Sequence, residues 1–229
     1  MQQTVILYLV RHGQTMLNLL DRSQGWADSP LTPAGEETAA RLGEGLRREG
    51  VRFTAAWSSD SGRARETARI LLAHMGQGGL PCTADKRFRE WCLGDLEGRP
   101  NLEFLTSLRG YDGQPIPLEN LNHRLPEAVD CVHKDHDSTG MSQSFSELSA
   151  RLLDGLRTAA EAVAVQGGGA GLIVSHALSI KTLVHLLVPE RMDEAGYLRN
   201  ASVCRFAYED GRFRALELND VHYLEDGQP

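Results

Sequence analysis

Short apolar runs alternate with longer amphipathic segments in the first third of the chain. Val5–Val10 is an unbroken apolar run, rich in β-formers, and is typical of a strand buried on both faces. Thr32 followed by Pro33 is typical of a helix start, and this helix is expected to run to about Arg48 and to stop at Gly50. The next expected elements are a strand near Phe53–Ser58 and a helix near Gly62–His74.

The second half of the chain continues this alternation. A long amphipathic helix is expected over Phe145–Val165, followed by a buried strand at Gly171–Val174 and a helix over Leu178–Leu187. From Ser202 to Leu218, apolar and polar residues alternate around Asp210-Gly211, which is a strong hairpin signal. Strands that alternate with helices predict an α/β fold: a doubly wound, mostly parallel sheet flanked by helices, with a C-terminal β-hairpin.

The stretch from Asn101 to about Ser144 breaks the alternation. It holds glycines, prolines and scattered apolar residues, and it shows little periodicity. Such a segment is too long to be a simple connecting loop in a compact domain. We therefore expect a single domain over residues 1–229, with residues 101–144 inserted as a partly helical cap or lid.

Composition narrows the class of protein. The chain has 229 residues, of which 31 are acidic and 24 basic, so its formal net charge is −7. This balance weakens the case for nucleic-acid or anionic-membrane binding. The four cysteines form no C-x-x-C pair, and Met1–Thr4 carries neither a basic region nor an apolar core. No apolar run has the roughly 18 residues that a membrane helix needs, and we expect a cytoplasmic protein without a signal peptide.

Polar residues follow three of the expected strands. They are Arg11-His12-Gly13, Ser58–Arg63 and Ser175-His176. Because parallel strands share a direction, all three sets should converge on one edge of the sheet, where ligands of open α/β sheets bind. Two histidines and two arginines at one edge form an anion site. Arginine suits the equatorial oxygens of a phosphoryl group, and a neutral imidazole can attack phosphorus.

Five segments, in order along the chain, resemble the motifs of the histidine phosphatase superfamily, which includes the cofactor-dependent phosphoglycerate mutases. Leu9–Thr15, followed by Asn18, resembles the R-H-G signature. The other matching segments are Gly25–Thr32 (G-W-x-D-x-x-L-T), Ser59–Ala68 (S-x-L-x-R-A-x-x-T-A), Arg89–Gly98 (R-E-x-x-x-G-x-x-E-G) and Val174–His176 (S-H-G).

The resemblance implies a role for each matching residue. His12 would be the catalytic nucleophile, and Arg11, Arg63 and His176 would bind the phosphoryl group. Asn18 would add a phosphate-binding amide, and His176 would also take part in catalysis. Glu90 would protonate the leaving group and then deprotonate the attacking water. The reaction would need neither a metal nor another cofactor.

The chain departs from the family pattern at four positions. Leu17 stands where many relatives carry tryptophan, and Ser61 stands where leucine is usual. Ala177 replaces the glycine after the second histidine, and Lys181 stands where arginine is frequent. None of these changes removes a catalytic group, so they bear on substrate fit.

A second cluster, Cys131–His136, contains cysteine, histidine and aspartate, the ligand types that suit zinc or another transition metal. It lies in the irregular insertion with Lys134 in its middle, and the expected chemistry needs no metal. We therefore predict no metal site.

The acceptor of the phosphoryl group separates a hydrolase from a mutase, and a binding role without catalysis stays open beside them. We expect a phosphomonoester hydrolase acting on a small phosphorylated metabolite. A phosphoglycerate mutase is the alternative, and a non-catalytic phospho-ligand binding module is the third. The insertion favours hydrolysis, because between Asn101 and Phe145 it has seven acidic and three basic residues and lacks the paired arginines of family mutases. The tail Asn219–Leu224 resembles that of the phosphatase members, which also favours hydrolysis. The resemblance to the family as a whole favours a homodimer.

Overall fold

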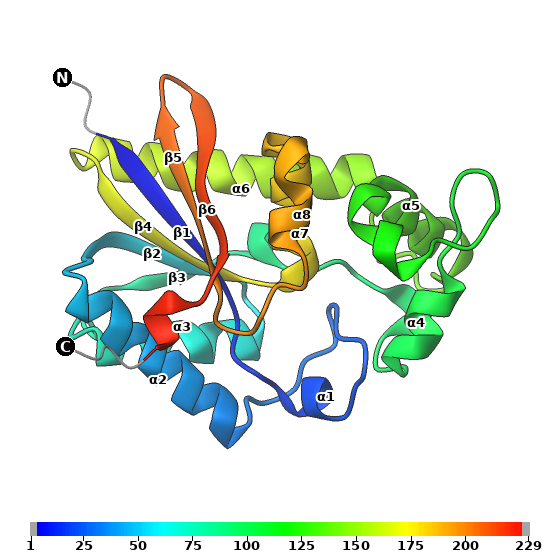
Figure 1. The fold of residues 1–229 in the computed structure, drawn as a ribbon, viewed down its shortest axis with the longest axis horizontal. Coiled ribbons are helices and arrows are strands. Elements are labelled where there is room, and N and C mark those ends of the chain that lie inside the picture. Colours follow the sequence, from blue (N-terminus) through cyan, green and yellow to red (C-terminus); the bar gives the residue numbers. More distant parts are fainter. Residues whose placement is uncertain (1–3, 226–229) are drawn as a thin grey trace.

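A computed structural model describes residues 4–225 of the chain (Figure 1). Its centre is one six-stranded sheet with the order β3-β2-β4-β1-β5-β6. The strands are β1 (Val5–Arg11), β2 (Phe53–Ser58), β3 (Cys82–Ala84), β4 (Gly169–Ser175), β5 (Val203–Glu209) and β6 (Arg212–Asp220). Of Met1–Thr4, on which the expectation about a signal peptide rests, the first three residues lie outside the described range.

The sheet is mostly parallel, as predicted. β1 pairs with β4, β4 with β2, and β2 with β3, all in parallel, whereas the hairpin β5–β6 adds to the other side of β1 in antiparallel orientation. The hairpin turns at Asp210 and Gly211, whose φ angles of 50° and 78° fit the left-handed region that a two-residue turn needs. Strand β3 was not predicted, because its three residues are all exposed and give no apolar run.

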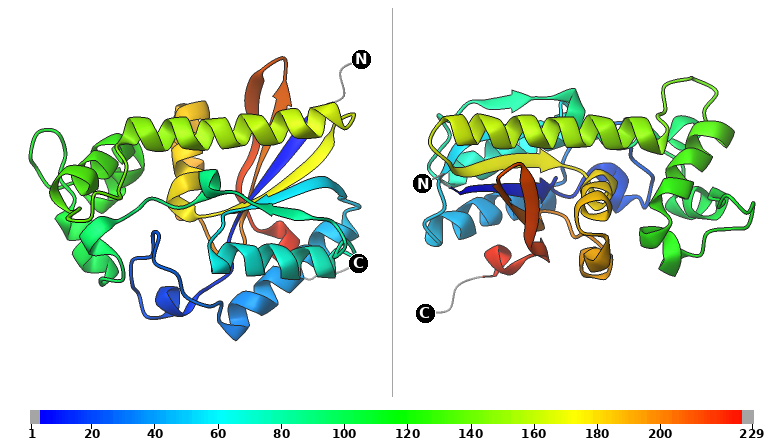
Figure 2. Two further views of the ribbon diagram at one scale, coloured as in Figure 1. Left: turned by 180° about the vertical axis from the view of Figure 1, so that it is seen from behind. Right: turned by 90° about the horizontal axis from the view of Figure 1, so that it is seen from above.

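Helices cover both faces of the sheet (Figure 2). Leu7 and Leu9 of β1 point to the face covered by α6 and α7, whereas Tyr8 and Val10 point to the face covered by α2 and α3. This alternation follows from the period of two along a strand. The helices are α1 (Met16–Leu19), α2 (Pro33–Arg48), α3 (Gly62–His74), α4 (Asn101–Ser107), α5 (Leu125–Asp135), α6 (Phe145–Val165), α7 (Ala177–Leu187) and α8 (Met192–Ala195).

Local chemistry explains where the long helices start. The Thr32 hydroxyl accepts a hydrogen bond from Gly35 N, and Pro33 occupies the first turn of α2, as predicted. At the start of α6, Ser144 and Glu147 form a reciprocal capping box. These caps fix the chain direction on either side of the sheet.

Residues 101–144 lie beyond one end of the sheet and contain α4, a 3-10 helix at Leu118–His123, and α5 (Figure 1). The segment is therefore partly helical, and its role as a cap or lid stays a prediction. Buried side chains of this segment, among them Phe104 and Leu125, belong to the same apolar cluster as Leu9 and Leu156 of the main body. Within residues 4–225, no helix combines the length and the apolar character that membrane crossing requires.

Candidate active site

The predicted site residues gather where β1, β2 and β4 end. His12 N donates to Ser175 O over 3.0 Å, and Ser59 N donates to Val174 O over 2.8 Å, so the three strand ends are tied together. Five predicted side chains are at most 7% exposed: Arg11, His12, Arg63, Glu90 and His176. Charged and polar groups buried to this degree need partners or a ligand.

His12 is held as a neutral ring with one free nitrogen. Its Nδ1 lies 2.7 Å from Gly13 O, and because a carbonyl oxygen only accepts, Nδ1 carries the proton. The unprotonated nitrogen is then Nε2, which can act as a nucleophile. Burial lowers the pKa of His12 well below its usual value, and the charges of Arg63 and Arg11 lower it further.

His176 is held as the opposite tautomer. Its ring centroid lies 5.2 Å from that of His12, and Arg63 Nε donates to its Nδ1 over 3.2 Å. Arginine only donates, so a neutral His176 carries its proton on Nε2, which lies 3.5 Å from Ser61 Oγ. Burial and then the charge of Arg63 lower the pKa of His176 well below the usual value. One ring therefore offers a lone pair and the other an N–H donor.

Arg63 is oriented by the loop between Gly25 and Asp28. Its Nη2 donates to Gly25 O over 2.7 Å, and its Nη1 donates to Ala27 O over 2.8 Å and to Asp28 Oδ1 over 3.0 Å. Burial lowers the pKa of Arg63, and the charge of Asp28 opposes this shift. The guanidinium is fixed in one plane beside His176.

Arg11 has a buried donor without a partner. Its Nη1 donates to Leu198 O, but its Nε has no hydrogen-bond partner among the described residues. A buried guanidinium N–H that is left unpaired is costly. An anion next to His12 would satisfy it.

Glu90 lies against the N-terminus of α7. Its Oε1 accepts from Trp91 N over 3.0 Å, and from both the N–H and the hydroxyl of Ser179 over 2.8 and 2.9 Å. Its Oε2 accepts from Leu178 N over 2.9 Å. Burial raises the pKa of Glu90, and the hydrogen bonds from Leu178, Ser179 and Trp91 oppose the rise. A raised pKa suits a carboxylic acid that donates a proton.

Glu90 and His176 line one cleft of about 320 Å³. Its other lining residues come mainly from the loops after β2 and around Trp26: Gly25, Trp26, Asp28, Ser59, Asp60, Ser61, Gly62, Arg89 and Met141. Met141 belongs to the insertion, so residues 101–144 contribute to the wall of this cleft.

Asn18 lies beside the loop that carries His12. Its Oδ1 accepts from Thr15 N over 3.2 Å and from the amide of Asn200 over 3.4 Å, and the same Asn200 amide donates to His12 O over 3.0 Å. Asn18 therefore belongs to the network behind the nucleophile. Its contact with a phosphoryl group stays a prediction.

Sequence reasoning missed several residues that hold the site together. Asp28 also accepts from Gly62 N at the start of α3, and Arg151 of α6 donates to the carbonyls of Arg87, Arg89 and Glu90 over 2.9, 2.9 and 3.3 Å. Asp28 lies in the segment Gly25–Thr32 that resembles a family motif, so the sequence did offer a signal that Asp28 belongs to the site. Arg151 lies in an ordinary amphipathic pattern, so nothing in the sequence marked it.

The Cys131–His136 segment falls on α5 and its C-terminal end. Cys131 Sγ accepts from Arg109 N over 3.3 Å, and His133 Nδ1 lies 3.1 Å from Ser142 Oγ. Within residues 4–225, the cluster brings no three potential metal ligands together. These side chains serve local contacts of the insertion.

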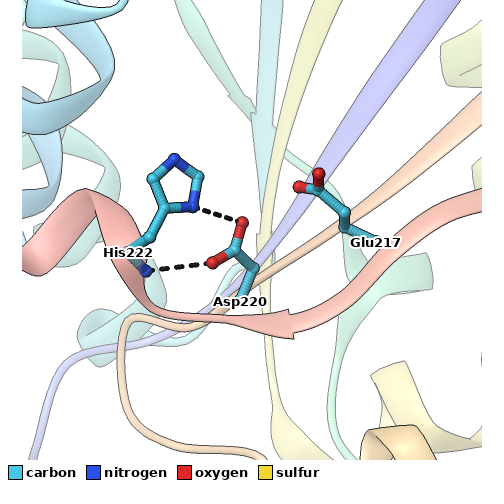
Figure 3. Close-up of side chains that lie close together, drawn as sticks. All are labelled: Glu217, Asp220 and His222. Carbon is cyan, nitrogen blue, oxygen red and sulfur yellow. Dashed lines mark hydrogen bonds and ion pairs between the residues drawn. The ribbon is translucent and has the colours of Figure 1, made fainter.

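One group within the described range does bring three potential ligands together, at the end of β6 (Figure 3). His222 lies 2.6 Å from Asp220 through Nδ1 and 2.6 Å from Glu49 through Nε2, and Glu217 forms an ion pair with Arg205. Burial lowers the pKa of His222, but the hydrogen bonds to Asp220 and Glu49 outweigh it and raise the value. A ring that donates from both nitrogens is a clamp between β6 and α2 and has no lone pair for a metal.

Comparisons with known proteins identify the family of the chain. The family model of the histidine phosphatase superfamily (branch 1) matches residues 7–221. A probable phosphoglycerate mutase GpmB of Citrobacter koseri is 33% identical over 211 residues, which cover 91% of this chain and 87% of that protein.

Two solved structures are also similar. The crystal structure of a phosphoglycerate mutase from Bacillus anthracis has a TM-score of 0.89 and 35% identity, and the match covers 97% of this chain and 96% of that one. A phosphoserine phosphatase from Entamoeba histolytica, in complex with 3-phosphoglyceric acid, has a TM-score of 0.70 and 25% identity over 96% of this chain and 100% of that chain.

Proposed function

The chain belongs to the histidine phosphatase superfamily (branch 1), and from this premise we propose that it is a metal-independent phosphomonoester hydrolase that forms a phosphohistidine on His12. The observation that carries the proposal is the pair of buried histidines of opposite tautomer, His12 and His176, together with Arg63, which donates to His176, and the buried, unpaired Nε of Arg11. We place the enzyme in the cytoplasm.

The reaction runs in two steps. Nε2 of His12 attacks phosphorus, the bond from phosphorus to the ester oxygen breaks, and the proton of Glu90 goes to the departing oxygen. Glu90 then takes a proton from water, whose oxygen attacks phosphorus; the bond from phosphorus to His12 Nε2 breaks, the lone pair returns to Nε2, and inorganic phosphate leaves. Arg11, Arg63 and the Nε2–H of His176 neutralise the charge on the equatorial oxygens.

The charges of the insertion favour water as the acceptor. Arg109 Nη1 donates to the carbonyls of Thr106 and Leu108, and Arg124 is paired with Glu127 and Asp112. Lys134 Nζ lies over the ring of Tyr111 at 5.8 Å. All three basic residues of the insertion therefore have local partners, whereas a mutase must retain a second anionic group while its substrate turns over.

Phosphoglycerate mutase activity is the second candidate. It is favoured by the relatives themselves, since the similar protein of Citrobacter koseri and the similar structure from Bacillus anthracis both carry that name. The similar phosphoserine phosphatase binds a small phosphorylated acid, which supports a small phosphorylated metabolite as substrate. We propose that residues 101–144 form a cap over this substrate.

The test is a substrate panel measured in EDTA. It contains p-nitrophenyl phosphate, 3-phosphoglycerate, phosphoserine and sugar phosphates, and phosphate release is followed. We expect hydrolysis without metal, and no exchange of 3- and 2-phosphoglycerate when 2,3-bisphosphoglycerate is added as primer. Primed exchange without net phosphate release would replace hydrolase by mutase. Neither activity in the folded protein would leave only a binding role.

A further inference from the structure

Glu97 has a hydrogen-bonding pattern that no other carboxylate outside the site shows within residues 4–225. It follows the acid Glu90 by seven residues and is half-buried. Its Oε1 accepts from Trp26 N over 2.6 Å and Leu93 N over 3.0 Å, and its Oε2 accepts from Gly25 N and Ala27 N, both over 3.0 Å. One side chain thus gathers four backbone N–H groups from two loops.

The loop held by Glu97 is the loop that orients Arg63. Its N–H groups point to Glu97, while the carbonyls of Gly25 and Ala27 accept from the Arg63 guanidinium over 2.7 and 2.8 Å. The indole of Trp26 donates to Glu90 O over 2.9 Å. The loop therefore lies between Glu97 on one side and two predicted site residues on the other.

The packing leaves this loop little freedom. A Cβ atom on Gly25 would lie 2.3 Å from Trp91 O and 2.5 Å from Glu97 Oε1, closer than real atoms approach. Burial lowers the pKa of Arg63, and the charge of Glu97 is among those that oppose this shift. Loss of the carboxylate would leave several N–H groups unpaired, so the loop would have to move.

We propose that Glu97 is a positioning residue of the phosphoryl pocket: its carboxylate fixes the loop of Gly25–Asp28, and the loop carbonyls aim the guanidinium of Arg63 at the substrate. The proposal rests on the proposed function, since it assigns Arg63 to the phosphoryl group. A carboxylate can accept from all four N–H groups, because both of its oxygens are acceptors. A glutamine at this position could not, because its amide nitrogen is a donor.

The experiment is a double-mutant cycle between Glu97→Gln and Arg63→Lys. Equilibrium binding of orthovanadate and kcat/KM for p-nitrophenyl phosphate are measured for all four proteins, and circular dichroism checks the fold. In the native background, Glu97→Gln should weaken orthovanadate binding by about tenfold or more. In the Arg63→Lys background Glu97→Gln should weaken orthovanadate binding by less than about threefold, because the guanidinium that the loop orients is already absent.

Glu103→Gln is the matched control, since Glu103 is an exposed carboxylate of the neighbouring helix α4 whose one ion pair, with Arg99, is long at 3.9 Å. It should bind orthovanadate as the native protein does. Equal losses from Glu97→Gln in both backgrounds, or no loss in either, would overturn the positioning role. Glu97→Asp keeps the charge with a shorter reach and serves the same cycle if Glu97→Gln does not fold.

The two proposals fail in different ways. Native protein that binds orthovanadate but does not hydrolyse p-nitrophenyl phosphate contradicts the hydrolase, and the binding cycle still tests Glu97. Hydrolysis with an additive cycle contradicts the role of Glu97 and leaves the hydrolase standing.

Discussion

The floor of the site and its cap are built from different kinds of contact. The floor, defined as Arg11, His12, Arg63, Glu90 and His176, is buried, and its partners lie far away in sequence, as in the pairs Arg63–His176 and Glu90–Ser179. The proposed cap, residues 101–144, pairs most of its charges locally and in contact with solvent, as in Arg124–Glu127.

This difference suggests that the floor carries out the reaction and that residues 101–144 bear on which substrate is bound. Long-range contacts between strand ends exist only when the whole sheet has formed, so the fold fixes the floor. Under the proposed function the floor would be preorganised for charge at phosphorus. Ion pairs between exposed, neighbouring residues contribute little to stability, so substitutions of these residues are tolerated. Substitutions in the floor should therefore alter the reaction itself, whereas charge substitutions in the cap should leave it nearly intact.

The largest difference between the two regions should come from their histidines. His12→Ala removes the nucleophile and should lower kcat by at least about a thousandfold. His133→Ala removes a cap histidine bonded to Ser142 and should leave kcat nearly unchanged. Phosphate release from p-nitrophenyl phosphate measures both. Substantial turnover by the His12 variant would contradict the division of roles.

The role of Glu90 as a proton donor should show in how the loss of activity depends on the leaving group of the substrate. Glu90→Gln cannot donate a proton as an acid, so alkyl phosphates should lose about 10²–10⁴-fold in kcat. An activated aryl phosphate needs no such proton and should lose much less. Glu127→Gln in the cap is the control and should affect both substrates alike. Equal losses from Glu90→Gln on both substrates would show that Glu90 is no general acid.

The pH profile tests the floor without a substitution. Activity needs His12 neutral and Glu90 protonated. Because the pKa of His12 is held well below 6.5 and that of Glu90 above 4.5, the acidic limb should lie below 6.5 and the alkaline limb above 4.5. We expect kcat/KM for an alkyl phosphate to fall on the alkaline side, and Glu90→Gln to remove that limb. An acidic limb at or above 6.5 would be inconsistent with a neutral His12.

The smallest effect is expected from a cap arginine. Arg124→Met breaks the partly exposed pairs with Glu127 and Asp112 and should change kcat/KM of the preferred substrate by less than about fivefold. A much larger loss on 3-phosphoglycerate alone would mean that the cap binds a second anionic group, and it would strengthen the mutase.

Much of the fold was readable from local patterns. The unbroken apolar run at Val5–Val10, the cap at Thr32-Pro33 and the turn at Asp210-Gly211 predicted β1, α2 and the hairpin, because each depends on neighbouring residues. The convergence of Arg11, His12, Arg63 and His176 followed from strand direction. The family resemblance was needed to add Glu90, since its loop has the composition of an ordinary charged surface.

What the sequence did not reveal depends on packing between distant segments. Arg151 contacts the loop of Glu90 across 61 residues, and Asn200 reaches His12 O across 188. Neither position stands in a pattern of its own, since one lies on an amphipathic helix and the other in a loop before β5. Their contribution becomes visible only when the helices lie against the sheet.

The central claim is that His12 accepts the phosphoryl group, and trapping the intermediate tests it most directly. The enzyme is mixed with ³²P-labelled substrate, quenched in alkali, digested, and its labelled peptides are sequenced by mass spectrometry. We predict an acid-labile, base-stable label on His12 that is absent from His12→Ala. A label on any other residue, or turnover with no labelled intermediate under single-turnover conditions, would contradict the account.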